Sequence, residues 1–230
     1  MVQSADLSAV CSDKIYANSG NLPLLGMLPA PRGGRRVLDC GCGAGDNARL
    51  LAQAGWRVTG ITISAEENAL ASRFCESTLV ADLEQGLPRG AEGPYDIILM
   101  SHLLEHLINP MKLLETSRRV LSPDGLLAVA LPNILAYPQR LAFLCGNFEY
   151  TDTGTMDHTH VRFYTFSTGR RLLTTNGYDV TRAEPDGGFP LWKLRFLLPD
   201  PVVRAINRTA CRAAPNLFGF QSLYLARPIV

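Results

Sequence analysis

Apolar runs alternate with amphipathic segments along the chain from residue 36 to residue 131. Runs rich in β-branched and aliphatic residues predict buried strands over residues 36–40, 57–63, 78–81, 95–100 and 126–131. Apolar positions at helical spacing predict helices between them, over residues 48–54, 64–74 and 111–121. This strand–helix alternation predicts an α/β fold built on a Rossmann-like, doubly wound sheet.

The rest of the chain is predicted to add to this one domain, which spans residues 1–230. Residues 1–35 form a polar preface with a short helix at 22–28, and residues 36–133 form the core. Residues 134–166 are predicted to form a cover segment, with a helical part over the aromatic and apolar residues 134–150 and an extended, histidine-rich part over 154–166. A helix over 167–176 and strands over 178–183 and 220–226 follow, and a helical insertion, residues 189–215, comes before the last strand.

Charge and composition narrow the class of protein. The formal net charge of +1 does not favour nucleic acid as a partner. The sequence has no apolar run near the roughly 20 residues that a membrane span needs, and the N-terminus lacks the pattern of a secretory signal. Six cysteines in such a chain are expected to be reduced thiols. We therefore predict a cytoplasmic protein without a resident metal.

The loops after the predicted strands are expected to meet at one site. In doubly wound sheets, ligands bind beyond the carboxyl ends of the strands, here after residues 40, 62, 82 and 100. Gly41, Gly43 and Gly45 alternate with small residues in the first of these loops. Glycine permits a left-handed turn and a close approach of the backbone to a ligand. The helix that opens near Asp46 offers unpaired N–H groups to that ligand.

Two residues argue against a dinucleotide in this loop. A dinucleotide-binding loop has a third glycine or alanine where this chain has Asp46, whose carboxylate at a helix start would repel a pyrophosphate. It also needs an acid about 20 residues on for the ribose, and the second predicted strand carries Thr62 there. Nicotinamide and flavin are therefore disfavoured. A ligand with a cationic centre and no phosphate fits better.

The motifs taken together resemble those of class I S-adenosylmethionine-dependent methyltransferases. VLDCGCGAG at 37–45 resembles the first motif of that family. VADL at 80–83, YDIILMSHLLEHLINP at 95–110 and LSPDGLLAVALPN at 121–133 follow in the family's order and spacing. Residues 157–180 resemble the segment that follows the fifth strand in small bacterial members of the family, including ubiquinone-biosynthesis-like O-methyltransferases. The resemblance covers residues 35–183 and implies a seven-stranded sheet whose last strand is antiparallel.

The same resemblance implies a seat for S-adenosylmethionine. Gly41, Gly43 and Gly45 would pack against its methionine part, with Asp39 supporting the amino group. The family pattern further implies that Asp82 and Leu83 contact the adenine. Met100 and Ser101 would contact the methionine end through their backbone atoms.

Thr62 departs from the family pattern, which has an acid at this position to grip both ribose hydroxyls. The Thr62 hydroxyl can still bond one ribose oxygen, but a charge-assisted bond is lost. Either cofactor affinity falls, or Glu66 or Glu67 substitutes for the missing acid. An alternative role for Glu67 is a capping box with Ser64, three residues before it.

The four histidines fall in two segments expected to face the site. Residues 102–106 read HLLEH, which matches a zinc-protease pattern, but their place directly after a buried strand argues against zinc. Methyl transfer to a phenol, amine or alcohol needs a proton acceptor, and histidine suits neutral pH. His106, His158 and His160 are the candidates. The alternatives are a packing role for His106 and a hydrogen-bond network around 157–160 that fixes the cover.

The insertion at 189–215 carries five basic residues against one acid, and Arg204, Arg208 and Arg212 would share one helical face. This predicts a lid, a peripheral membrane contact, a homodimer contact or a solvated basic face. The sequence thus predicts methyl transfer to the oxygen or nitrogen of a small or lipid-like acceptor. The alternative is a non-catalytic cofactor-binding protein with the same fold.

Overall fold

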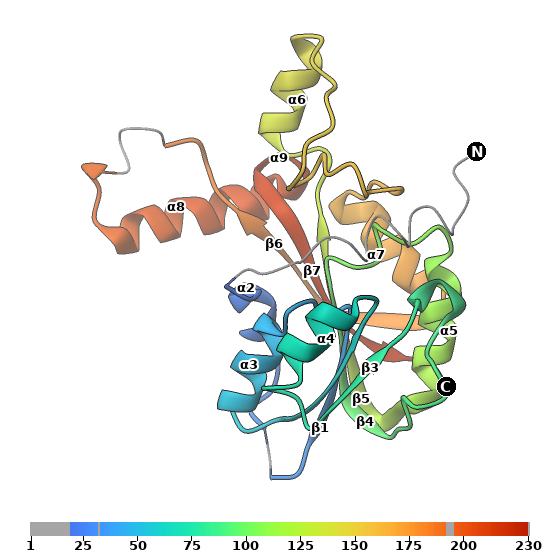
Figure 1. The fold of residues 1–230 in the computed structure, drawn as a ribbon. Coiled ribbons are helices and arrows are strands. Elements are labelled where there is room, and N and C mark those ends of the chain that lie inside the picture. Colours follow the sequence, from blue (N-terminus) through green and yellow to red (C-terminus); the bar gives the residue numbers. More distant parts are fainter. Residues whose placement is uncertain (1–18, 32, 192–195, 230) are drawn as a thin grey trace.

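A single seven-stranded sheet forms the centre of the molecule (Figure 1). The computed structural model describes residues 19–31, 33–191 and 196–229. The strand order is β3-β2-β1-β4-β5-β7-β6, and β7 is antiparallel to both of its neighbours. The strands are β1 Arg36–Cys40, β2 Arg57–Thr62, β3 Ser77–Val80, β4 Tyr95–Ser101, β5 Leu121–Pro132, β6 Tyr178–Gly187 and β7 Gly219–Pro228. The predicted Rossmann-like sheet with an antiparallel last strand is confirmed.

Helices cover both faces of this sheet. One face is covered by α2 and α3, and the other by α5 and α7 (Figure 1). The helices are α2 Leu22–Leu25, α3 Asp46–Gln53, α4 Ala65–Ala71, α5 Pro110–Val120, α6 Tyr137–Leu144, α7 Phe166–Thr175, α8 Asp200–Ala213 and α9 Pro215–Phe218, with a 3-10 turn η1 at Leu83–Gln85. The insertion before β7 is helical, as the sequence predicts.

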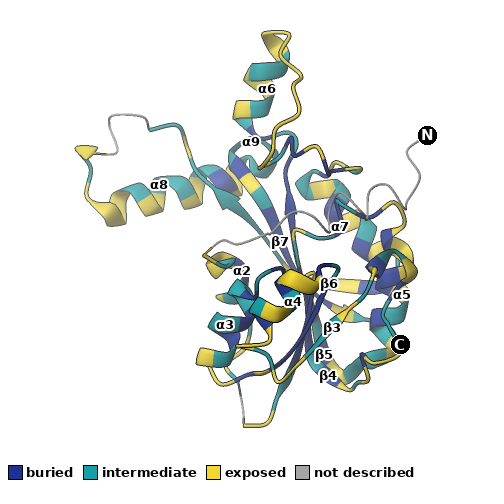
Figure 2. Cartoon of the chain, viewed as in Figure 1, coloured by how far each residue is buried: buried dark blue, intermediate teal, exposed yellow. Residues whose placement is uncertain are grey.

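Alternating side chains of the central strands explain why both faces are covered. In β4, Ile97 and Leu99 join the core beneath α2 and α3, whereas Ile98 and Met100 join the core beneath α5 and α7. All four are essentially fully buried (Figure 2). Since a strand buried on both sides has no polar face, its sequence is a continuous apolar run.

Several predicted boundaries differ from the structure. The helix expected at 22–28 stops at Leu25, because Gly26 follows it as the C-cap. The strand expected from 126 begins at Leu121, since Tyr95 pairs with Leu121 and Ile97 with Leu126 across an irregularity in the ladder. Residues 122–125 are therefore extra residues within β5 rather than a separate turn. The final strands β6 and β7 are also longer than expected.

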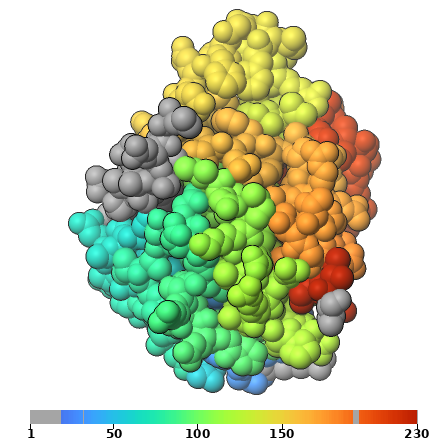
Figure 3. All heavy atoms as spheres, turned by 90° about the vertical axis from the view of Figure 1, so that its right-hand side faces the viewer, coloured from blue at the N-terminus to red at the C-terminus, as the bar shows by residue number. Residues whose placement is uncertain are grey.

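Two helical segments extend away from the sheet. None of the residues in α6 is buried, and the segment around it projects from the body of the molecule (Figures 1 and 3). The second segment, α8, carries Arg204, Arg208 and Arg212, all exposed on one helix. Tyr16 and Asn18 of the N-terminal preface, and Lys193 and Arg195 of the insertion, lie outside the described residues.

Candidate active site

A cavity of about 460 Å³ opens at the carboxyl ends of β1, β2, β3 and β4. Its walls come from the four loops that the sequence predicts to converge, with residues 41–43, 62–63, 81–84 and 101–103. Residues 19–21 and Pro23, around the start of α2, and Gln221 of β7 also line it. The predicted convergence of loops is therefore present, together with contributions from the preface and the last strand.

The glycine loop forms one wall of this cavity. Gly41 and Gly43 line it, with φ angles of +70° and +52°. A Cβ at Gly41 would lie 2.9 Å from Cδ1 of Leu103, so only glycine leaves this part of the cavity open. Gly45 has φ +92° and stands at the N-cap of α3, where a Cβ would lie 2.8 Å from the Cα of Ala71. Gly45 therefore allows α3 and α4 to pack closely, and it does not line the cavity.

Asp39 lies at the end of β1, directly before the glycine loop, and is 1% exposed. Neither of its carboxylate oxygens has a hydrogen-bond partner in the structure. Burial raises the pKa of this carboxyl to about 7. An orphaned buried carboxylate is costly, so a cationic group that binds over the glycine loop would relieve it. This supports a positively charged ligand at the loop.

Thr62 and Glu67 form one polar unit beside the glycine loop, at the end of β2. Both residues line the cavity, and Thr62 Oγ1 donates a hydrogen bond to the Glu67 carboxylate at 2.5 Å. The Ser64 hydroxyl accepts from the backbone N–H of Glu67, as in the predicted capping box. The Glu67 side chain, however, bonds Thr62 and is held 2% exposed at the cavity wall. Glu66 is exposed and does not belong to the lining.

The loop after β3 supplies Asp82 and Leu83. Both line the cavity, and Asp82 also caps η1 by accepting from the backbone N–H of Glu84 at 2.9 Å. The Glu84 carboxylate accepts from the backbone N–H groups of Ile108 and Asn109, so it ties η1 to the start of α5. These hydrogen bonds fix the position of the loop after β3 relative to the loop after β4.

The end of β4 forms the floor of the cavity. Ser101 and His102 line it, whereas Met100 is fully buried below them. The Asn21 side-chain amide donates to Ser101 Oγ at 3.2 Å and to Gln221 Oε1 at 2.9 Å. Nε2 of His102 lies 3.0 Å from the same Gln221 oxygen. The preface, β4 and β7 thus meet in one polar cluster that sequence reasoning missed.

Glu105 stands behind His102. Its carboxylate is fully buried, and His102 Nδ1 lies 3.3 Å from Oε1. Burial disfavours the charged forms of both side chains. The attraction between the imidazolium and the carboxylate outweighs this effect, so the pKa of His102 is raised and that of Glu105 is lowered. The carboxylate therefore stabilises the protonated imidazole.

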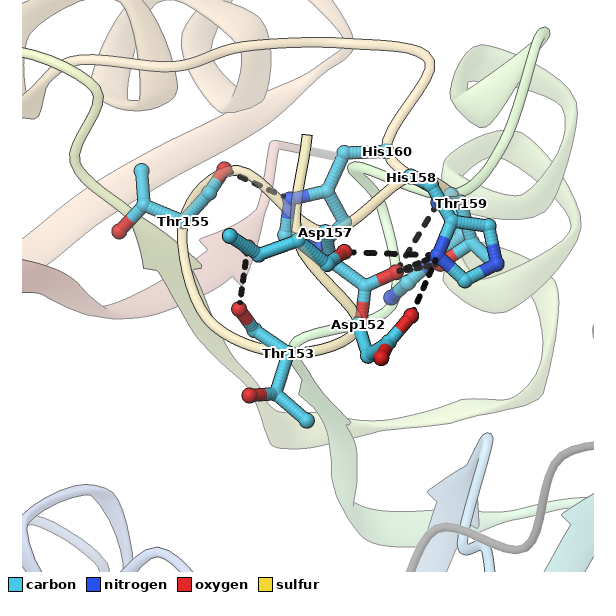
Figure 4. Close-up of polar contacts among 9 residues, drawn as sticks. Asp152, Thr153, Thr155, Asp157, His158, Thr159 and His160 are labelled. Atoms are coloured by element: carbon cyan, nitrogen blue, oxygen red, sulfur yellow. Dashed lines mark hydrogen bonds and ion pairs between the residues drawn. The ribbon is translucent and has the colours of Figure 1, made fainter. Parts of the chain in front are cut away.

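Among the predicted histidines, only His106 lines the cavity. His106 Nδ1 lies 3.0 Å from Thr159 Oγ1, which in turn donates to Asp157 at 2.7 Å. His160 is buried and packs edge-on against the His106 ring, with its Nδ1 bonded to the Thr155 carbonyl (Figure 4).

His158 lies outside the cavity lining. Its side chain is 45% exposed, 3.7 Å from Asp157 and 3.9 Å from Asp152 (Figure 4). The segment that carries these histidines is fastened to the turn after β4. Backbone N–H groups of Val161 and Arg162 donate to the Glu105 carbonyl, and the Arg162 guanidinium donates to the Ile108 carbonyl at 3.1 Å. Residues 157–162 therefore support the cavity wall from behind, as the hydrogen-bond network weighed from the sequence would.

Residues 102–106 form a turn rather than the helix that a zinc-protease motif requires. Glu105, His106 and His160 do bring one ligand atom each within 4.8 Å of one another. The two segments that carry these residues are the ones that the sequence predicts to face the site, although His160 comes from a loop more than fifty residues further along the chain.

Comparison with known proteins agrees with this geometry. A family model described as "Methyltransferase domain" matches residues 14–183. Among curated proteins, a ubiquinone biosynthesis O-methyltransferase from Caulobacter sp. is 36% identical over 135 residues, covering 55% of this chain and 53% of that protein. Its counterpart from Actinobacillus pleuropneumoniae is 33% identical over 104 residues, covering 41% and 44%. The chain thus matches about half the length of these relatives.

Solved structures share the fold. An S-adenosylmethionine-dependent methyltransferase from Methanosarcina mazei superposes with a TM-score of 0.62 at 18% identity, covering 92% of this chain and 99% of that one. Magnesium protoporphyrin IX methyltransferase from Synechocystis, solved with bound S-adenosylhomocysteine, superposes with a TM-score of 0.56 at 18% identity, covering 84% and 74%. The family match and the fold define a class I S-adenosylmethionine-dependent methyltransferase domain. The chain belongs to the methyltransferase-domain family.

Proposed function

We propose that this domain transfers a methyl group from S-adenosylmethionine to the oxygen or nitrogen of a small, uncharged acceptor. The observation that carries the proposal is the charge of the cavity. Its described lining includes Asp46, Glu67, Asp82 and Glu84 but no lysine or arginine. Carboxylates suit the ammonium and sulfonium charges of the cofactor, whereas an anionic acceptor would be repelled.

The cofactor seat follows the cavity walls. The methionine part would lie along Gly41, Gly43 and Ser101. Its ammonium group would stabilise the ionised form of Asp39, which has no hydrogen-bond partner. Thr62 and Glu67 would together hold the ribose hydroxyls, since the hydroxyl and the carboxylate already form one hydrogen-bonded unit at this wall. Asp82 and Leu83 would flank the adenine.

When bound, S-adenosylmethionine supplies an electrophilic methyl carbon attached to a sulfur that leaves as a neutral thioether. The residues of the chain then have three tasks: to place the acceptor in line, to exclude water and to accept its proton. Of the three predicted histidines, His106 keeps a candidate role because it lines the cavity, while His160 would act by fixing the His106 ring.

The outer helical segments support a lipid-like acceptor or a membrane-bound one. Phe196 and Leu197, directly before α8, are about 80% exposed, and Arg204 and Arg208 are exposed on α8 itself. Exposed apolar side chains beside arginines suit an anionic membrane surface. The described chain contains no helix long and apolar enough to cross a membrane. We expect binding to phosphatidylglycerol vesicles in a sedimentation assay, and its loss in an Arg204→Glu/Arg208→Glu variant, whereas equal binding by that variant would oppose the proposal.

Free thiols support a reducing, cytoplasmic location. Cys40, Cys42, Cys75, Cys145 and Cys211 are all unbridged.

Calorimetric titration followed by an acceptor screen tests the proposed function. We expect both S-adenosylmethionine and S-adenosylhomocysteine to bind, and methyl transfer to appear on neutral phenols or amines. Absence of binding by both ligands would overturn the proposal. Binding without transfer to any phenol, amine or carboxylate would favour the non-catalytic alternative.

A further inference from the structure

His102 is held in an unusual backbone conformation at the cavity floor. Its φ angle of +54° is the only positive φ among the described non-glycine residues. A left-handed conformation is costly for a residue with a Cβ, and such residues cluster at functional sites. The conformation follows directly after β4 and places the imidazole in the cavity lining, with 42% of the side chain exposed.

Both ring nitrogens of His102 lie near acceptor atoms, and Nε2 also lies 3.5 Å from the Asn21 amide nitrogen. Nδ1 lies 3.3 Å from Oε1 of Glu105, and Nε2 lies 3.0 Å from Oε1 of Gln221. The orientation of the Gln221 amide is set by its neighbours, because its Nε2 donates to Asp186 at 2.7 Å and its Oε1 accepts from Asn21. The site is therefore arranged to stabilise a ring that carries a proton on each nitrogen.

We propose that His102, backed by the buried carboxylate of Glu105, is the residue that removes the proton from the methyl acceptor. The inference rests on the proposed function and deepens it, since it names the acceptor class as a neutral O–H or N–H group. His102 is the catalytic residue in this arrangement. Glu105 is a positioning residue, which orients the ring and stabilises its charge.

The proton transfer balances as follows. The neutral ring carries one N–H and one nitrogen lone pair. As the acceptor oxygen or nitrogen forms its bond to the methyl carbon, the acceptor proton passes to the ring nitrogen that carries the lone pair, and the electron pair of the breaking carbon–sulfur bond stays on sulfur. The products are the methylated acceptor, a neutral thioether and an imidazolium ion. The imidazolium is the form that Glu105 and Gln221 stabilise.

His106 is less suited to this step. Burial lowers the pKa of His106, although the Glu105 carboxylate opposes that shift. A ring with a lowered pKa is a weaker proton acceptor than one with a raised pKa. The raised pKa of His102 also predicts that methyl transfer rises with pH as His102 loses its proton. The groups that face it are Glu105, His106 and, behind Gln221, Asp186.

Nuclear magnetic resonance titration of the histidine ring signals tests the pair without turnover. The signal that disappears in His102→Gln identifies His102. We expect it to titrate above the ordinary value of 6.5, about one unit lower in Glu105→Gln, and at an intermediate value in Glu105→Asp. Glu76→Gln, which removes an exposed carboxylate paired with Arg57, is the matched control and should leave the signal unchanged.

Gln221→Leu provides a second variant should Glu105→Gln fail to fold. It removes the other acceptor atom, so the pKa of His102 should again fall. Titration of His102 at or below 6.5, or a pKa unaffected by both substitutions, would overturn the proposal whatever the acceptor.

A pair of acceptor probes adds a kinetic readout. Catechol must lose its proton on the enzyme, whereas 4-nitrocatechol ionises by itself near neutral pH. We expect His102→Gln to lower kcat at least about 100-fold with catechol and less than about fivefold with 4-nitrocatechol. The dissociation constant of S-adenosylhomocysteine should stay within about threefold, because the ring contacts the acceptor. If His106→Gln shows this selective loss and His102→Gln does not, His106 is the base.

The two proposals fail in different ways. Loss of S-adenosylhomocysteine binding by the unmodified protein would overturn the proposed function. If S-adenosylhomocysteine binds but the pKa of His102 does not depend on Glu105 or Gln221, only the proposed role of His102 and Glu105 is overturned. If neither catechol is methylated, the titration alone decides the inference.

Discussion

Thr62 donates a hydrogen bond of 2.5 Å to Glu67 across the turn between β2 and α4. The bond supports the proposal that Glu67 replaces the acid that the family pattern has at the end of the second strand. Glu67 lies in the first turn of α4, five residues after Thr62, and the Thr62 hydroxyl holds its carboxylate near the strand end. Carboxylate oxygens have several lone pairs, so Glu67 can accept from Thr62 and from a ribose hydroxyl at once.

Glu67→Gln is therefore expected to weaken binding of S-adenosylhomocysteine. Hydrogen bonds to a charged acceptor are about twice as strong as neutral ones, so the dissociation constant should rise about tenfold or more in calorimetry. Glu66→Gln is the matched control, because Glu66 is the exposed neighbour outside the lining. Equal effects of the two substitutions would mean that general charge, and not this contact, controls affinity.

Asp39 makes the ligand-free protein less stable as pH rises. Burial lifts its folded-state pKa from 3.8 to about 7, so the folded protein binds more protons than the unfolded chain between these values. Stability is therefore lost as pH rises through this range, and the full cost of a few kcal/mol is present above it. Asp39→Asn removes that cost. We expect it to raise Tm at about pH 8 but much less at about pH 4, and to weaken S-adenosylmethionine binding at least about tenfold.

Differential scanning calorimetry at the two pH values, without ligand, checks the stability part of this prediction. Asp96→Asn is a suitable control, because Asp96 is a half-exposed carboxylate at the other end of the sheet. A Tm of Asp39→Asn that is lower than that of the unmodified protein at both pH values would show that the carboxylate stabilises the free fold.

The sequence predicts the parts of the site that depend on local patterns. The glycine loop, the doubly wound sheet and the convergence of four loops follow from Gly41 and Gly43 after an apolar strand and from strand–helix alternation, whereas the antiparallel last strand is implied by the family resemblance. These features need only neighbouring residues. The structure confirms the sheet and its antiparallel last strand.

The missed parts depend on contacts between distant segments. The cluster of Asn21, His102 and Gln221 joins residues up to 200 positions apart, and no spacing rule relates them. The positive φ of His102 has no sequence signal either, since histidine rarely adopts it. His158 and His160 illustrate the converse: their clustering in sequence predicts a place in the site, but the loop directs His158 to solvent and His160 behind His106.

Thr159 links His106 to Asp157, and this link predicts a stabilising role for the segment behind the cavity. Thr159→Val keeps the shape of the side chain but removes both hydroxyl bonds. We expect the free energy of unfolding to fall by about 1–3 kcal/mol, measured as a lower urea midpoint with an unchanged slope. Thr78→Val, in a strand where β-branched residues suit the backbone, should have little effect. Equal midpoints for the two variants would show that the 157–160 segment does not contribute to stability.

Alanine substitutions at Gly45 and Gly55 distinguish the cost of backbone strain from the cost of a steric clash with the new Cβ. Their φ angles are nearly the same, +92° and +96°, so alanine is strained to a similar degree at both, about 1 kcal/mol. The space differs. At Gly55 the nearest atom to a new Cβ is Pro31 Cγ at 3.8 Å, whereas at Gly45 it is the Ala71 backbone at 2.8 Å.

Gly45→Ala must push α4 away from α3 and shift Glu67 with it. We expect it to destabilise the protein by about 2–3 kcal/mol more than Gly55→Ala in urea unfolding and to weaken S-adenosylhomocysteine binding, which Gly55→Ala should leave unchanged. Equal losses of stability at the two positions would show that α4 yields without cost, and the close packing would then not be what requires glycine at position 45.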